Sequence, residues 1–282
     1  MEVKVKKRIF ILISLILAAL LLSACNPQEA APGSNLLNIL VFVAVGFVAQ
    51  MIDGALGMAY GVSSNTFLLS IGIPPAAASA SVHMAEVVTT GVSGISHWRL
   101  GNLDKSLIKR LLIPGVIGGV AGAYLLTAIN GDVIKPYISA YLLIMGIVIL
   151  VKAFNLNGEH REVTSHISIL GLIGGFFDAI GGGGWGPIVT TTLVARGKNP
   201  RYAIGSVNFS EFFVTLAESI TFVLTLAFGQ YWQTILGLLV GGVIAAPLAA
   251  TMTKKIPTKV LMFLVGVVII VLSIRTIYNA LA

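Results

Sequence analysis

The chain has 282 residues, of which 56% are hydrophobic and only 10% charged, and its mean hydropathy is +0.95. A water-soluble domain of this size could not bury so much apolar surface, so the composition excludes a soluble protein and indicates a polytopic helical protein in a lipid bilayer. The formal charge of +7 is carried by basic clusters between apolar runs, which follows the positive-inside rule and argues against nucleic-acid binding.

The first segment is a basic stretch, then an apolar stretch, then small residues that end at Cys25, the single cysteine. This order is typical of a signal sequence, and "LLSAC" resembles a bacterial lipoprotein box, which predicts lipidation of Cys25 outside the membrane. An uncleaved first helix is the alternative. We expect a leader or first helix over 1–25 and a polar tether over 26–35. A single cysteine excludes an intramolecular disulfide.

Ten apolar runs follow, separated by short polar segments. Their lengths and positions predict membrane spans at 36–53, 59–73, 76–97, 107–129, 134–153, 166–181, 185–196, 202–228, 232–252 and 258–278.

The segment 53–90 aligns with 178–215 at a constant offset of 125 residues, with twelve identities over 38 positions. This pattern predicts that the chain contains an internal duplication. We expect transmembrane repeat 1 over 36–155, a cytoplasmic linker over 156–165 and transmembrane repeat 2 over 166–282.

An odd number of spans in each copy predicts that the second copy is inverted relative to the first. Lys and Arg gather in loops that the positive-inside rule assigns to the cytoplasm, near 98–110, 152–165, 196–201 and 254–259. The predicted fold is an all-α transmembrane bundle of two inverted repeats, an architecture typical of secondary transporters of the plasma membrane.

The second span of each copy is too short to cross as a straight helix and follows a glycine-rich turn, "DGALGMAYG" in copy one and "DAIGGGGWG" in copy two. A helix that begins inside the membrane presents free N–H groups and the positive end of its dipole, which suits an anion. The substrate contacts predicted here are Gly57, Gly182 and Gly183. Tyr60 and Trp185 follow the turns and are either walls of the site or interface-belt aromatics.

Polar residues also recur inside the third span of each copy. They are Ser81, His83 and Glu86 in copy one, and Ser206, Asn208 and Glu211 in copy two. Polar groups within a span are costly and therefore candidates for function, although hydrogen bonding between helices is an alternative role. We predict substrate binding by Ser81, His83, Ser206 and Asn208. Because ionised acids would repel an anion, we predict proton coupling by Asp53, Glu86, Asp178 and Glu211.

The duplicated turns around Asp53 and Asp178, together with the helix start "AIGSVNFSE" (203–211), resemble the sulfite exporter TauE/SafE family of bacterial permeases, also called the toluene-sulfonate uptake permeases. The resemblance spans roughly 38–274. In copy one, "ASASVHMAE" departs from the family pattern, with Ala80 in place of glycine and His83 in place of asparagine. The resemblance implies proton-driven transport of sulfite or organosulfonates.

The predicted function is a proton-coupled secondary transporter of small anions. An anion channel would need the same lining, and a cation transporter could use the intramembrane acids as ligands, so both alternatives stay open. An enzyme is not expected, because the sequence has neither an H-E-x-x-H nor a G-x-S-x-G motif. No cofactor or metal is expected.

Overall fold

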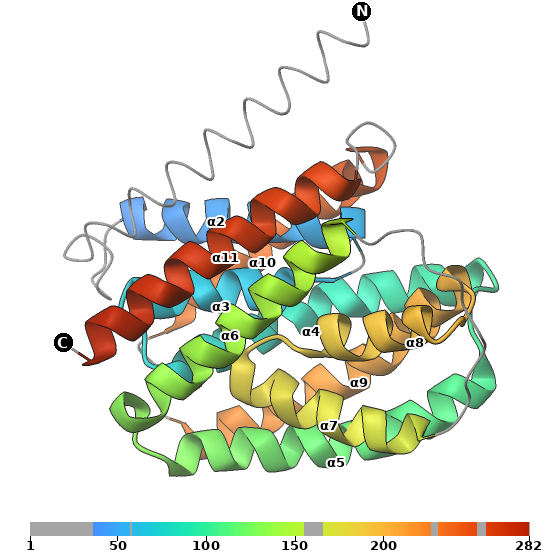
Figure 1. Ribbon diagram of the computed structural model, residues 1–282, viewed down its shortest axis with the longest axis horizontal. Helices are drawn as coiled ribbons and strands as arrows, with labels where there is room; N and C mark the ends of the chain where they lie inside the picture. Colours follow the sequence, from blue (N-terminus) through green and yellow to red (C-terminus); the bar gives the residue numbers. More distant parts are fainter. Residues whose placement is uncertain (1–35, 57, 155–165, 227–230, 253–257, 282) are drawn as a thin grey trace, which may run out of the picture.

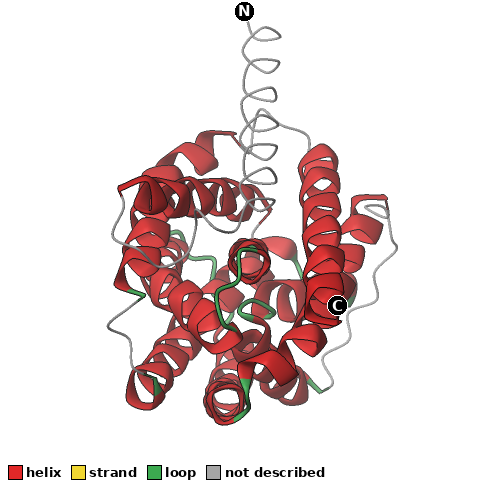
Figure 2. Ribbon diagram, turned by 90° about the vertical axis from the view of Figure 1, so that its left-hand side faces the viewer, coloured by secondary structure: helices red, strands yellow, loops and turns green. Residues whose placement is uncertain are grey.

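The computed structural model describes residues 36–56, 58–154, 166–226, 231–252 and 258–281. These residues form the helices α2 (Leu36–Leu56), α3 (Tyr60–Ser70), α4 (Pro75–Arg99), α5 (Lys105–Ala128), α6 (Gly131–Phe154), α7 (Ile167–Gly181), the π-helical turn η2 (Gly186–Thr190) that continues into α8 (Thr191–Ala195), α9 (Pro200–Thr225), α10 (Trp232–Met252) and α11 (Thr258–Leu281). Figure 1 shows this order, and Figure 2 shows helices and loops without strands in the described part. The predicted leader, tether and linker, with Cys25 and Gly57, lie outside it.

Each of the ten predicted spans coincides with a helical segment whose ends lie within a few residues of those expected. By length and composition, α5, α6, most of α9 and most of α11 could each cross a membrane. Large apolar side chains point outward from the bundle, such as Leu224, which is 79% exposed. Such a surface is unfavourable in water and favourable against lipid, so the chain is a multi-pass membrane protein.

Proline and glycine set the ends of the helices near the breaks. Pro75 and Pro200 lie in the first turns of α4 and α9, where the N–H that proline lacks would have no helical partner. Gly72 and Gly197 follow α3 and α8 with φ angles of 94° and 85°. This left-handed conformation is readily adopted by glycine and ends a helix.

Local hydrogen bonds recur 125 residues apart, which is the offset of the predicted duplication. The N–H of Ile73 donates to the carbonyl of Leu68 at 3.1 Å, and the N–H of Lys198 donates to that of Leu193 at 3.0 Å. Together with the preceding left-handed glycines, these bonds make the same helix-ending motif in both copies. Two threonine pairs follow the same rule, each hydroxyl donating to a carbonyl one turn earlier: Thr66 with Thr191, and Thr90 with Thr215.

The two copies interleave in one bundle. The most extensive packing joins α2 to α10, α5 to α7, α4 to α9 and α6 to α11, so each of these pairs takes one helix from each copy. Figure 1 shows α5 and α7 side by side along one edge, with α2 and α10 near the opposite edge. The core therefore lies between the copies, and residues from both can meet there.

The two glycine-rich breaks contact each other at the centre of this core. A Cβ on Gly61 would lie 2.6 Å from the Cα of Gly183 and 2.7 Å from the carbonyl oxygen of Gly182, so a side chain there would overlap backbone. The side-chain amide of Asn65 donates to the carbonyl of Gly181 at 2.5 Å. The glycines therefore allow the backbone of one break to lie directly on the other.

Candidate substrate cavity

A small cavity lies beside the two breaks and is lined by both copies. Its lining residues are Asp53, Met58, Ala59, Tyr60, Gly61, Val62, Glu86, Asp178, Gly183, Gly184, Gly186, Pro187 and Glu211. The four acids predicted from sequence thus converge, two from each copy. None of the lining residues is Lys or Arg, and the space has room for about one water molecule. The cavity is therefore small, and acids from both copies line it.

Two of these acids bind the starts of the short helices that follow them. Asp178, near the end of α7, accepts hydrogen bonds through Oδ1 from the backbone N–H groups of Gly184 at 2.5 Å and Trp185 at 2.8 Å. Asp53, near the end of α2, accepts a bond from the backbone N–H of Tyr60 in the same way. N–H groups at a helix start have no partner within the helix. Each acid therefore places its negative charge at the positive end of a helix dipole.

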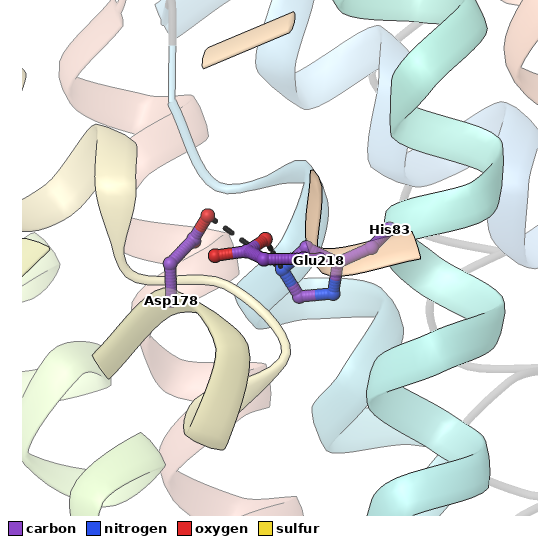
Figure 3. Close-up of side chains that lie close together, drawn as sticks. All are labelled: His83, Asp178 and Glu218. Atoms are coloured by element: carbon purple, nitrogen blue, oxygen red, sulfur yellow. Dashed lines mark ion pairs between the residues drawn. The ribbon is translucent and has the colours of Figure 1, made fainter. Parts of the chain in front are cut away.

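Asp178 also faces a histidine, His83, and a carboxylate outside the cavity lining, that of Glu218. His83 on α4 places Nε2 2.8 Å from Oε2 of Glu218 on α9 and 3.6 Å from Oδ2 of Asp178. Figure 3 shows the three side chains pointing toward one another from three different helices. All three are buried. The contacts are close ion-pair distances but are not aligned as hydrogen bonds, because His83 Nε2, Asp178 Oδ2 and both Glu218 oxygens have no hydrogen-bond partner.

The orientation of His83 is fixed by its other ring nitrogen. Nδ1 lies 2.7 Å from the carbonyl oxygen of Ser79, one turn earlier in α4. A carbonyl can only accept, so Nδ1 donates and Nε2 is turned toward the carboxylates. The hydroxyl of Ser79 donates to the carbonyl of Ala179 at 2.5 Å, which ties α4 to the end of α7. The ring of Phe222 packs against the imidazole with 6.0 Å between ring centroids.

Three predicted substrate contacts lie away from this cavity. The hydroxyl of Ser81 donates to a carbonyl of its own helix. Ser206 Oγ accepts a bond from the backbone N–H of Asp104 at 2.7 Å, and Asn208 Nδ2 donates to Ser93 Oγ at 3.0 Å. Ser206 and Asn208 thus bind other segments of the bundle, Ser81 binds its own helix, and the role of all three in binding substrate stays a prediction.

The two aromatic residues after the breaks are buried, so the interpretation as interface-belt residues is wrong. Tyr60 lines the cavity, and its hydroxyl donates to the carbonyl of Leu238 at 3.1 Å. Trp185 is 0% exposed, and its indole N–H donates to the carbonyl of Val207 at 3.2 Å. Of the predicted glycines, Gly183 lines the cavity.

Sequence reasoning missed Glu218. The aligned segments end at Thr90 and Thr215, three residues before Glu218 and its equivalent, Ser93. A signal was nevertheless present, because Glu218 follows Glu211 by seven residues, or about two helical turns, and so shares a face of α9 with it.

Comparison with known proteins agrees with the architecture. The family model described as "Sulfite exporter TauE/SafE" matches residues 42–276. The chain is 45% identical over 250 residues to the "Probable membrane transporter protein YtnM" of Bacillus subtilis (strain 168), an alignment that covers 86% of this chain and 83% of the relative. It is 27% identical over 154 residues to the "Probable membrane transporter protein ORF9" of Sinorhizobium sp, covering 53% of this chain and 58% of that protein.

No solved structure matches the chain significantly. The family match covers most of the sequence and includes the breaks, the acids and the α4–α9 contact. Family and relatives are membrane transporters and not enzymes. This helical, multi-pass chain with an acidic cavity between its two copies therefore belongs to the sulfite exporter TauE/SafE family and is a transporter of the bacterial cell membrane.

Proposed function

We propose that the chain is a secondary transporter that moves small anions, namely sulfite or organosulfonates, together with protons. One observation carries the proposal: the carboxylates of Asp53 and Asp178 occupy the two helix starts that wall the cavity. The description of the matching family as sulfite exporters supports a sulfur oxyanion as the substrate.

The helix starts explain how an anion and a proton enter together. Asp178 Oδ1 already accepts from the N–H groups of Gly184 and Trp185, which are the donors that a substrate oxyanion would need. An ionised carboxylate both occupies these donors and repels the incoming anion. A protonated carboxyl group is uncharged and accepts more weakly, so it releases the donors. Binding of the anion is therefore favoured when Asp178 carries a proton.

The small cavity fits a carrier better than a channel. Its space has room for about one water molecule, so the bundle must rearrange before a sulfite ion can bind there. Two inverted copies that meet at their breaks would open alternately to the two sides, as in other repeat transporters. The predicted inversion is part of this proposal.

A cation transporter is the second candidate, and one feature favours it. Five carboxylates gather in and beside the cavity: Asp53, Glu86, Asp178, Glu211 and Glu218. Such a cluster would attract a small cation as readily as protons. The two candidates differ in the flux that the variant Asp178→Asn should reduce, which is sulfite flux for the anion transporter and cation flux for the cation transporter.

The proposal can be tested in proteoliposomes by uptake of radiolabelled sulfite, with and without an imposed pH gradient. Sulfate, taurine and sulfoacetate serve as competitors. The test variant is Asp178→Asn, whose amide oxygen still accepts from the helix start but cannot exchange a proton. Asp132→Asn is the matched control, because Asp132 is an exposed acid at the start of α6.

We expect saturable sulfite uptake that rises with the pH gradient and that falls at least about tenfold in Asp178→Asn but not in the control. Flux that grows linearly with concentration and ignores the gradient would indicate an anion channel. Absence of sulfite flux, together with cation flux abolished by Asp178→Asn, would overturn the proposal in favour of the cation transporter.

A further inference from the structure

Helices α4 and α9 meet through polar side chains at two places that the duplication relates. At one, His83 of α4 contacts Glu218 of α9 at 2.8 Å. At the other, Ser93 of α4 contacts Asn208 of α9 at 3.0 Å. Adding the repeat offset of 125 to His83 gives Asn208, and adding it to Ser93 gives Glu218. The two contacts are therefore equivalent positions of the duplicated fold, one ionisable and one neutral.

The short contact favours a proton in the ionisable pair. Nδ1 of His83 donates to the Ser79 carbonyl, so it carries one hydrogen. Nε2 then lies 2.8 Å from Glu218 Oε2. A neutral imidazole would leave the charge of a buried Glu218 carboxylate unbalanced, and one further proton, on His83 or on Glu218, balances it.

Asp178 is the nearest acceptor for that proton. Its Oδ2 lies 3.6 Å from His83 Nε2 and has no hydrogen-bond partner, whereas its Oδ1 binds the helix start. In the transfer, the Nε2–H bond breaks and an O–H bond forms on Oδ2. His83 is left neutral with its Nδ1 hydrogen, Glu218 stays a carboxylate, and Asp178 becomes uncharged. The separation exceeds a hydrogen bond, so a small movement of the ring or of α7 against α4 must bring the atoms together.

The surroundings of the pair, over the residues that the structure describes, offer further carboxylates but no second cation. The titratable groups that interact with His83, Asp178 or Glu218 are Glu86 on α4, Tyr141 on α6 and Glu211 on α9, and Glu86 interacts in turn with Asp53 on α2 and Tyr60 on α3. On α5, Gly119 lies against the Glu218 carboxylate and offers no side chain. Among the described residues that line the cavity or face this cluster, His83 alone can become a cation.

We propose that His83 and Glu218 are the proton-loading site of the transporter, which holds the coupled proton and passes it to Asp178. The inference rests on the proposed function, since Asp178 is the acid whose charge blocks the anion. Ser93 and Asn208 hold the same two helices together without binding a proton. Because only one of the two equivalent contacts can bind a proton, we predict that one proton moves with each substrate anion.

The duplication suggests the test. The double variant His83→Asn with Glu218→Ser installs the neutral pair of the second contact at the first. Two assays in proteoliposomes separate coupling from transport: exchange of labelled sulfite against unlabelled sulfite inside, and accumulation of sulfite against its gradient driven by a pH difference. Exchange does not require the carrier to release its proton, whereas accumulation does. Ser93→Ala is the matched control.

We expect exchange by the double variant to slow but persist, while accumulation falls at least about tenfold. Accumulation that survives in the double variant would overturn the proton-loading site and leave the proposed function standing. Failure of the wild type to exchange sulfite would instead overturn the proposed function.

Glu218→Gln covers the case in which the double variant does not fold. It keeps the side-chain shape and one acceptor oxygen but replaces the other oxygen with an NH2 group that takes up no proton, and it should likewise exchange without accumulating. Proton influx measured with a pH-sensitive dye inside the vesicles should then be lost in Glu218→Gln and kept in Ser93→Ala. Influx that follows sulfite uptake in Glu218→Gln contradicts the assignment.

Discussion

The two contacts between α4 and α9 have the same place in the duplicated fold and opposite chemistry. Asn208 and Ser93 form a neutral hydrogen bond, whereas His83 and Glu218 form a buried ionisable pair that also faces Asp178. A neutral bond is satisfied by its two partners alone. A buried ionisable pair is stable only while its protons balance its charges. The two positions are equivalent at the offset of 125 residues, and only one of them holds ionisable side chains.

The largest expected effect comes from displacing one member of the ionisable pair. A Cβ on Gly119 would lie 2.8 Å from Glu218 Cγ and 3.0 Å from Cδ, so Gly119→Val must move the carboxylate from its present position beside His83. We expect pH-driven sulfite accumulation to fall at least about tenfold. Gly94→Ala is the control at the neutral contact, where the new Cβ would lie 3.2 Å from Phe209 Cα and 3.6 Å from the Asn208 carbonyl oxygen, so the neighbouring backbone must shift by only a few tenths of an ångström. Equal losses in both variants would show that the two contacts are not distinct.

An intermediate effect is expected from removing one partner of each contact. His83→Ala leaves Glu218 and Asp178 buried without a cation, which we expect to destabilise the fold by about 3 kcal/mol. Asn208→Ala loses a single neutral bond, for about 1 kcal/mol. Thermal unfolding in detergent measures the difference. If Asn208→Ala lowers the unfolding temperature as much as His83→Ala, the charges of the ionisable pair contribute no more to stability than the neutral hydrogen bond does.

The smallest effect is expected for Ser93→Ala. The Ser93 hydroxyl accepts one bond from Asn208, and its loss should change stability by about 1 kcal/mol or less. The pH dependence of sulfite uptake should keep the wild-type shape, as measured by initial rates over a series of external pH values. A displaced or flattened profile would mean that the neutral contact also takes part in coupling.

The helices could be predicted because glycine, proline and apolar runs act locally. Asp53 and Asp178 could be singled out from their matched places before the two breaks, although their meeting at one cavity was not predicted. The partner of Asn208 could not be predicted, because the rotation of α4 against α9 is set by packing between the copies. Glu218 was missed for a related reason: its equivalent is Ser93, and a search for identical residues passes over a position where the two copies differ.

The backbone contact between Gly61 and Gly183 has a mechanical consequence. Side-chain contacts absorb a displacement by changing rotamers, but two glycines pressed together have none to change. Because the backbones are in direct contact, a shift of one helix start should move the other. In the proposed carrier, this contact would link opening on one face of the membrane to closure on the other, and so limit leakage through a bundle open at both ends.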